Sequence, residues 1–497
     1  MIAALGLSGG VASAPTLPNL VVIVADDLGW HCTGAKEPSI LTPNLDELQQ
    51  NGVELNSYYS YKYCSPTRAS LLTGRFPFKT ESTRNNLIPF SQEDGVNLNF
   101  TMLPAKLKKA GYATHGIAKW HQGFWQQAYT PTARGFDSYN GYLAGGQDHF
   151  TQASFHECGC PARDVWVNGL PDPDPSIKGV YNAFRFTSAA ETIISSHNAS
   201  AAPLFMYLAL QNTHAPVEAD ASFTALYPSE TYTTRRDFSA MISAMDSSLG
   251  NVTRALKAAG MWDNTILIWV SDNGTPVDVG GSNWPLRGSK GSNWEGGVRV
   301  PAVWGGGLLP ASRYGLNISG LIHVSDIYST LCELAGVDSD DGDWAPVDGV
   351  NVWPYISGTN STPPRTRIIH EHNMFQVDAN VTGAIRDGDY KLIIATEYAA
   401  DWYGDTSDGH FTPPRTGSQN MTKTACSPLA PCLFNINLDP EERNDISSTS
   451  PAIVANLLAI FHSYDTQHHP PTAAPPRNDA ACCAASKKAG DVVAPWG

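Results

Sequence analysis

The sequence lacks an apolar run long enough to cross a bilayer, so it predicts no transmembrane segment. It also lacks a basic stripe, and its formal net charge of −15 argues against a nucleic-acid partner. An anionic substrate is not excluded, because a local cluster of Lys, Arg and His can make one pocket positive. Charged residues are scarce at 16%, whereas hydrophobic residues reach 42%, which indicates a globular chain.

Cysteine is also scarce, with an odd total of nine. An odd cysteine in a secreted protein indicates a free thiol or an intermolecular bond. Cys426 and Cys432 are plausible disulfide partners across a short loop, whereas the adjacent Cys482 and Cys483 have no partners that the sequence assigns.

Two features favour passage through a secretory pathway. Residues 1–14 are uncharged and end in Ala12-x-Ala14, which suits a signal-peptide cleavage site, although an unstructured N-terminus is an equal alternative. Besides the formal triplet Asn273-Gly-Thr, glycosylation triplets begin at seven asparagines, which are Asn99, Asn198, Asn251, Asn317, Asn360, Asn380 and Asn420. We therefore expect a glycoprotein that is secreted or lysosomal, or periplasmic in a bacterium.

Short β-branched runs alternate with segments of helical periodicity along the first two thirds of the chain. The runs predict buried strands at 19–25, 112–118, 203–210 and 265–270. The periodic segments predict helices at 41–52, 103–110 and 241–259. This alternation is typical of an α/β domain with a mainly parallel sheet.

A Pro363-Pro364 turn predicts a domain boundary. We expect a leader stub or unstructured segment at 1–18, a catalytic domain at 19–364 and a smaller α+β domain at 365–497. In the smaller domain, strands are predicted at 384–394 and 432–436, a helix at 453–461, and a Pro/Ala-rich loop from residue 468 onward.

Four predicted strands end in polar residues that are capable of chemistry. These ends are Asp26-Asp27, Lys119-Trp120-His121, Asn212-Thr213-His214 and Asp272-Asn273. Ligands of parallel sheets bind at the carboxyl ends of strands, so the active site is expected at this edge.

The segment from Cys64 to Arg68 reads Cys-Ser-Pro-Thr-Arg, and Leu-Leu-Thr-Gly-Arg follows at 71–75. The composition gives about 0.02 chance matches to Cys-x-Pro-x-Arg. Pro66 suits the first turn of a helix, so Cys64 is expected just before a helix N-terminus, where free N–H groups favour anions.

This segment resembles the formylglycine-generating signature of the sulfatase family, within the alkaline-phosphatase-like superfamily. The resemblance runs over nearly the whole chain and is greatest to the N-acetylgalactosamine-4-sulfatase (arylsulfatase B) branch. It is carried by Ala-Asp-Asp-Leu-Gly-Trp at 25–30, Asn-Trp-Pro-Leu-Arg-Gly at 283–288, Asn-Trp-Glu-Gly-Gly-Val-Arg at 293–299, Pro-Cys-Leu-Phe at 431–434 and Asp-Pro-Glu-Glu-Arg at 439–443. The implied fold is a large mixed, mainly parallel sheet sandwiched by helices, with a smaller C-terminal α+β domain.

The resemblance implies hydrolysis of sulfate esters on a sulfated carbohydrate or an aryl sulfate. A separate formylglycine-generating enzyme would oxidise Cys64, and the hydrated aldehyde has one oxygen to attack sulfur and a second to expel sulfate. One Ca²⁺ ion would be bound by residue 64 and four hard oxygen donors, which are Asp26, Asp27, Asp272 and Asn273. Capping of strand ends is the ordinary alternative for such residues.

The remaining roles are also implied by the resemblance. Arg68 would hold the hydrate, His121 would act as the base for sulfate elimination, and Lys119 and Lys290 would contact the sulfate oxygens. His214 would contact the bridging oxygen, and Asp148 and His149 lie where relatives place substrate-side loops. This chain reads Ala118-Lys-Trp-His-Gln-Gly123, whereas the family usually has Gly-Lys-Trp-His-Leu-Gly, so packing is expected to differ at Ala118 and Gln122.

Two alternatives remain from the sequence. A phosphatase or phosphodiesterase of the same superfamily would use Ser or Thr as nucleophile and two zinc ions with additional His ligands. A non-catalytic glycan-binding relative would have lost some of the catalytic groups. The Cys64 signature, the oxygen donors and the complete set of catalytic groups favour a sulfatase.

Overall fold

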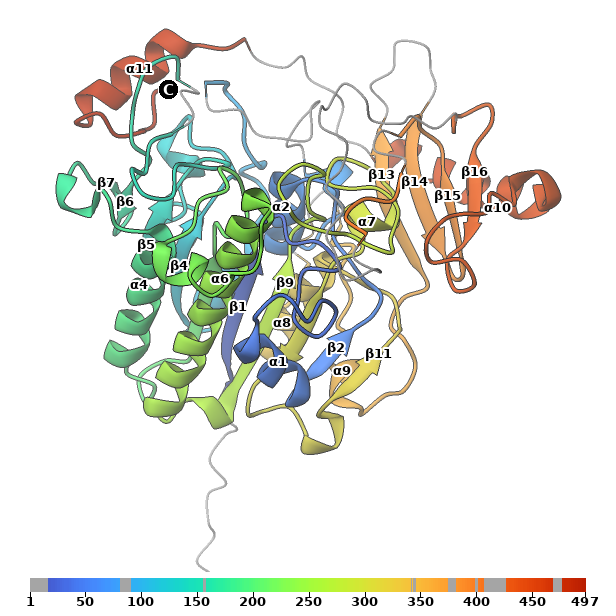
Figure 1. The fold of residues 1–497 in the computed structure, drawn as a ribbon, viewed down its shortest axis with the longest axis horizontal. Helices are drawn as coiled ribbons and strands as arrows, with labels where there is room; N and C mark the ends of the chain where they lie inside the picture. Colours follow the sequence, from blue (N-terminus) through green and yellow to red (C-terminus); the bar gives the residue numbers. More distant parts are fainter. Residues whose placement is uncertain are drawn as a thin grey trace, which may run out of the picture.

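The computed structural model describes residues 17–80, 91–154, 158–340, 342, 346–373, 381–397, 401–405, 426–467 and 476–497. These residues form a large domain around a ten-stranded sheet and a smaller four-stranded sheet (Figure 1). The leader-like residues 1–14 and the triplets at Asn380 and Asn420 lie outside the described residues.

The large sheet is mixed and mainly parallel. In chain order its strands are β1 (Asn19–Ala25), β2 (Val53–Leu55), β4 (Ala113–Lys119), β5 (Ser138–Tyr142), β6 (Trp166–Val167), β7 (Leu170–Pro171), β8 (Leu204–Ala209), β9 (Thr265–Ser271), β10 (Ala302–Gly305) and β11 (Leu316–Ile318). Their order in space is β11-β2-β10-β9-β1-β8-β4-β5-β6-β7. The central strands β9, β1, β8, β4 and β5 are parallel neighbours, and β10 is antiparallel to β9. The predicted fold class is confirmed.

The central strands are buried because helices cover both faces of the sheet. Every residue of β1, β8 and β9 is buried, as their continuous, mainly apolar sequences predict. In front in Figure 1 lie α1 (Pro43–Gln50), α4 (Asn182–Ser196) and α6 (Thr233–Ala258), which pack together. A second packed group contains α2 (Cys64–Thr73), α3 (Leu103–Lys109) and α8 (Ser325–Leu334).

Shorter elements connect this framework. They are the strand pair β3 (Tyr58–Tyr59) and β12 (Ile322–His323), and the helices α5 (Ala221–Thr224), α7 (Glu295–Val298) and α9 (Trp353–Ser357). Helix α6 begins at Thr233 rather than at the predicted residue 241, because its first turn is polar and has no apolar periodicity. None of the helices in the described part of the chain combines the length and apolarity needed to traverse a membrane.

The smaller sheet is antiparallel and consists of β13 (Arg367–Asn373), β14 (Thr382–Asp387), β15 (Tyr390–Ile393) and β16 (Cys432–Asn435). Helix α10 (Pro451–His462) packs on it. The single strand predicted at 384–394 is wrong, since this segment forms a hairpin. Its two-residue Gly388-Asp389 turn provides the reason, because Gly388 adopts a φ of 57° without a steric penalty.

The tail after residue 476 is not a loop, so that prediction is wrong as well. Helix α11 (Asp479–Lys488) begins where the Asn478 side chain accepts a hydrogen bond from the Ala481 N–H, and its alanines favour a helix. Disulfides Cys158–Cys482 and Cys160–Cys483 attach α11 to the large domain, opposite the smaller sheet in Figure 1. The predicted Cys426–Cys432 pair is confirmed.

Candidate active site

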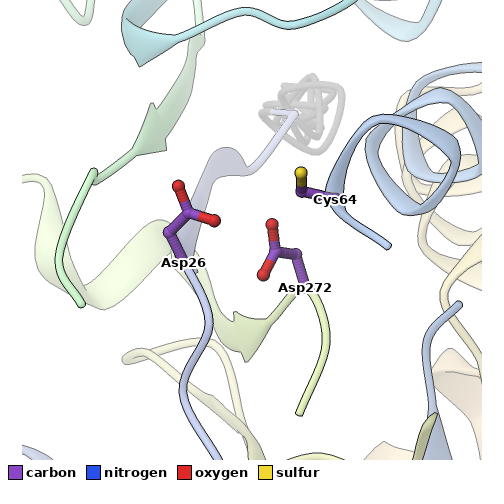
Figure 2. Close-up of side chains that lie close together, drawn as sticks. All are labelled: Asp26, Cys64 and Asp272. Carbon is purple, nitrogen blue, oxygen red and sulfur yellow. The ribbon is translucent and has the colours of Figure 1, made fainter. Parts of the chain in front are cut away.

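The carboxyl ends of β9, β1, β8 and β4 lie side by side, because these strands are consecutive parallel neighbours. Side chains from three segments meet there. One ligand atom each of Asp26, Cys64 and Asp272 lies within 4.8 Å of the others, and Figure 2 shows the three side chains close together. Asp26, Asp27 and His214 form a second group within the same limit.

Cys64 is the first residue of α2, one position further into the helix than predicted, and Pro66 lies in the first turn. The Cys64 side chain is buried, with Sγ 3.4 Å from Nδ1 of His121. Burial raises the pKa of the Cys64 thiol despite the nearby lysines. The unmodified side chain is therefore not an activated thiolate at neutral pH.

The four oxygen-donor residues at the ends of β1 and β9 are buried, namely Asp26, Asp27, Asp272 and Asn273. Within the described residues, Oδ1 of Asp26 and Oδ1 of Asn273 accept no hydrogen bond. Burial raises the pKa of Asp26 to about 7, with the neighbouring carboxylates adding to this effect. Buried carboxylate and amide oxygens with unused acceptor capacity fit a hard divalent cation such as Ca²⁺.

Three cationic side chains contact these carboxylates, and Arg68 Nη2 forms an additional ion pair with Asp26 Oδ1 at 3.5 Å. Arg68 Nη2 lies 2.7 Å from Asp272 Oδ2, Lys119 Nζ lies 2.7 Å from Asp26 Oδ2, and Lys290 Nζ lies 2.8 Å from Asp27 Oδ2. Arg68 and Lys119 have no exposed side-chain surface, whereas that of Lys290 is 16% exposed. Lys290 is therefore the cation of this group that a ligand from solvent can contact.

The two site histidines favour the neutral form. Burial, followed by the charges of Lys119 and Arg68, holds the pKa of His121 well below its usual value. Burial and two lysines lower the pKa of His214 to about 3. His214 Nδ1 lies 2.7 Å from the Ala215 carbonyl oxygen, so Nδ1–H donates there and Nε2 is available toward Asp27, 3.9 Å away.

The backbone is strained at three non-glycine residues of this site. Asp27, Ala118 and His121 adopt φ values of 61°, 73° and 55°. Ala118 stands where the family usually has glycine, and only glycine adopts this φ without strain. The Gln122 side chain donates to the Ser65 carbonyl oxygen at 3.1 Å and thereby links the end of β4 to α2.

The predicted substrate-side residues Asp148 and His149 have backbone partners. Asp148 Oδ1 accepts from the N–H groups of Phe150 and Thr151 at 3.0 and 2.6 Å. His149 is buried, and its Nε2 lies 3.0 Å from the carbonyl oxygen of His214. His149 thus supports the backbone of His214, whereas the partly exposed Asp148 stabilises its own turn.

Sequence reasoning missed supporting residues of the site. Thr67 Oγ1 donates to the Asp272 carbonyl oxygen at 2.8 Å and ties α2 to the end of β9. The position of Thr67 inside the Cys64–Arg68 motif is the sequence signal that could have identified this role. Gln122 was noted only as a departure from the family pattern, since nothing local in the sequence indicates its contact with Ser65.

With this geometry established, comparison with known proteins identifies the family. The family model described as Sulfatase matches residues 18–337. The chain belongs to the sulfatase family. The predicted enzyme class, a sulfuric ester hydrolase, is confirmed, and it takes the place of the phosphatase and glycan-binding alternatives.

Individual relatives support the same assignment over most of the sulfatase. It is 35% identical to arylsulfatase J of Mus musculus, over 89% of this chain and 74% of that protein. It is 30% identical to N-acetylgalactosamine-6-sulfatase of Mus musculus, over 90% of this chain and 85% of that protein. The solved structure of Ps i-CgsB in complex with k-i-k-neocarrahexaose has a TM-score of 0.74 at 25% identity, over 92% and 95% of the two chains.

Proposed function

We propose that this sulfatase removes sulfate from a sulfated sugar or polysaccharide, with a formylglycine made from Cys64 by a generating enzyme and with one Ca²⁺ ion. The observation that carries the proposal is the meeting of Cys64, Asp26 and Asp272 within 4.8 Å of one another at the end of the sheet. Cationic side chains surround this group, as an anionic ester requires.

Calcium would be held by Asp26, Asp27, Asp272, Asn273 and residue 64. The unused Oδ1 atoms of Asp26 and Asn273 support this set. A bound ion would offset the repulsion between the buried carboxylates and act as a Lewis acid toward a sulfate oxygen. Zinc would be disfavoured, because this set contains only oxygen donors once Cys64 is converted, whereas usual zinc sites contain Cys and His ligands.

The side chains of this protein would bind and orient the sulfate. Lys290 and Lys119 supply fixed positive charge, and Lys290 is the one that reaches solvent. Arg68 lies beside Asp272 and residue 64, so its guanidinium would hold the hydrate that forms there. Charges fixed before the substrate arrives stabilise developing negative charge without reorganisation.

The two histidines would accept and donate protons during the reaction. Neutral His121 has Nδ1 3.4 Å from the Cys64 sulfur, so it can accept a proton from a hydroxyl group at this position. The hydrate supplies two hydroxyls on one carbon, one to attack sulfur and one to drive release of sulfate. His214 would donate from Nε2 to the bridging oxygen, which requires that Nε2 gain a proton when the anionic substrate binds.

The proposed substrate class and the proposed cellular compartment rest on different observations. The names of two similar proteins contain a sulfated-sugar activity and a carrageenan-type oligosaccharide, which favours a carbohydrate here. Three disulfides fit an oxidising compartment, so a secreted or lysosomal glycoprotein is proposed. Four of the predicted glycosylation sites are exposed, namely Asn99, Asn198, Asn317 and Asn360.

The direct experiment measures sulfate released by the purified protein from aryl sulfate, sulfated N-acetylgalactosamine and sulfated galactan oligosaccharides. Aryl phosphate serves as the competing substrate, and Cys64→Ala as the inactive control. We expect sulfate release from the sugars and the aryl sulfate, with little phosphate release. A preference for the phosphate, or equal activity of Cys64→Ala, would contradict the proposal.

A further inference from the structure

We propose that Glu371, on β13 of the smaller sheet, is a positioning residue that holds the loop carrying Lys290 in place relative to Cys64. The inference rests on the roles proposed above for Cys64 and Lys290. It gives the smaller sheet a part in turnover, although the proposed catalytic side chains all come from the large domain.

The Glu371 carboxylate accepts hydrogen bonds from two segments of the large domain. Its Oε2 accepts from Lys62 Nζ and from Asn293 Nδ2, both at 2.6 Å, and its Oε1 accepts from the Tyr61 hydroxyl at 3.2 Å. The Glu371 side chain is only 7% exposed, so water cannot readily replace these partners. The carboxylate thereby links segments far apart in sequence.

Both segments lead directly to the active site. Lys62 stands two residues before Cys64, and Asn293 stands three residues after Lys290. The segments also touch each other, since the Gly291 N–H donates to the Lys62 carbonyl oxygen at 2.9 Å. Glu371 therefore fixes the position of the Lys290 loop relative to the segment that precedes Cys64.

A second carboxylate from the smaller domain fixes the same loop. Glu397 Oε2 accepts from the Asn293 N–H at 3.0 Å, and Glu397 Oε1 accepts from Asn293 Nδ2 at 2.6 Å. Asn293 is thus held through both its backbone and its side chain. The Lys290 ammonium extends from this anchored loop to Asp27.

Glutamine keeps the shape of Glu371 but not its charge. The oxygen of the glutamine can accept from Lys62 and Asn293, and its amide can donate to the Tyr61 hydroxyl, so Glu371→Gln removes the negative charge closest to Lys62 and weakens these two charge-assisted contacts. The resulting shift of the Lys290 loop is expected to lower kcat/KM about 10- to 100-fold, because small displacements of a charge contact are costly in catalysis.

The test is a double-mutant cycle with Lys290→Ala, read as kcat/KM on an aryl sulfate and as the inhibition constant of inorganic sulfate. The matched control is His372→Gln, at the residue that follows Glu371 on β13. The His372 side chain is also buried, but it hydrogen-bonds to the Phe461 carbonyl oxygen rather than to the Lys290 loop. Melting temperatures are measured for every variant. A purely structural role predicts that both β13 variants lose activity only in proportion to unfolded protein.

We expect Glu371→Gln to lower kcat/KM and weaken sulfate inhibition when Lys290 is present, and to change kcat/KM by less than about twofold in the Lys290→Ala background. His372→Gln should keep the kinetics of the folded wild type. An equal fold-loss in both backgrounds would overturn the inference. If Lys290→Ala itself kept full activity, the proposed function of Lys290 would fail instead. If Glu371→Gln does not fold, the same cycle with Glu397→Gln decides by the same criterion.

Discussion

The molecule contains two clusters of buried charged side chains, one structural and one in the active site, and they differ in their access to solvent. The junction cluster joins the large domain to the smaller sheet, with Lys391 Nζ 2.9 Å from carboxylate oxygens of both Glu295 and Glu442. All three of these side chains have no exposed surface. The active-site cluster contains Cys64, its surrounding carboxylates and cations, and two side chains that reach solvent, Lys290 and His214.

The difference shows that burial of charge alone does not mark an active site. At the junction Lys391 lies between two buried carboxylates, and Arg299 Nη1 lies 3.6 Å from Glu295, so buried ion pairs fix two structural units together. Glu442 at the junction also has a positive φ, of 55°, and an Oε1 atom that accepts no hydrogen bond, so neither feature separates the clusters. The active-site cluster differs because ligand atoms of Asp26, Cys64 and Asp272 lie within 4.8 Å of one another beside side chains that reach solvent. Grouped ligand atoms together with access from solvent indicate chemistry.

The largest effect expected in the active-site cluster is that of Cys64→Ser. The variant keeps one hydroxyl able to attack sulfur but has no second hydroxyl to expel sulfate, so turnover should stop after a covalent sulfate ester forms on the introduced side chain. Intact-protein mass after incubation with an aryl sulfate measures the adduct. Cys64→Ala is the unreactive control, and Cys332→Ser tests a buried cysteine outside the site. Sustained turnover by Cys64→Ser would remove the two-hydroxyl argument.

The next comparison sets Lys290→Ala against Lys391→Met. The first removes a charge from the substrate side and should lower kcat/KM about 10²–10³-fold with little change in melting temperature. The second leaves Glu442 buried without its cation and leaves Glu295 with the more distant Arg299, and it should destabilise the fold by about 3–5 kcal/mol. Steady-state kinetics and thermal unfolding of both variants test this. The reverse pattern would mean that the two clusters had been assigned the wrong roles.

A smaller effect is expected from Asp27→Asn, which removes one charge from the proposed calcium ligands. The variant should need more Ca²⁺ for half-maximal activity and recover most of its turnover at saturating calcium. Calcium titration after chelation measures the shift, with Glu442→Gln as the corresponding change at the junction. Activity that survives exhaustive chelation in the unmodified protein, or stoichiometric zinc in metal analysis, would contradict the calcium assignment.

The fold and the active-site edge were predictable because their signals are local. The β-branched run at Asn19–Ala25 is a buried strand with the predicted bounds, and Asp26 and Asp272 follow two strands that pair directly. Parallel strands place their carboxyl ends at one edge of the sheet, so the sequence alone predicts that residues far apart in the chain lie close together there.

The remaining features depend on contacts that no local pattern encodes. The attachment of Cys482 and Cys483 to Cys158 and Cys160 follows from the path of the tail across the large domain. The anchoring of the Lys290 loop by Glu371 likewise depends on how the smaller sheet packs on the large domain. Helix α11 was missed for a different reason, since its Asn478 cap and alanines were overlooked beside the neighbouring prolines.

The most direct test of the account is mass spectrometry of the peptide that contains position 64, on protein produced together with a formylglycine-generating enzyme. The buried Cys64 thiol has a raised pKa and a single reactive group, so the proposed chemistry requires its conversion. We predict that the peptide carries an aldehyde in place of the thiol and that specific activity rises in proportion to the converted fraction. Fully active protein in which Cys64 is entirely unmodified would contradict the central claim.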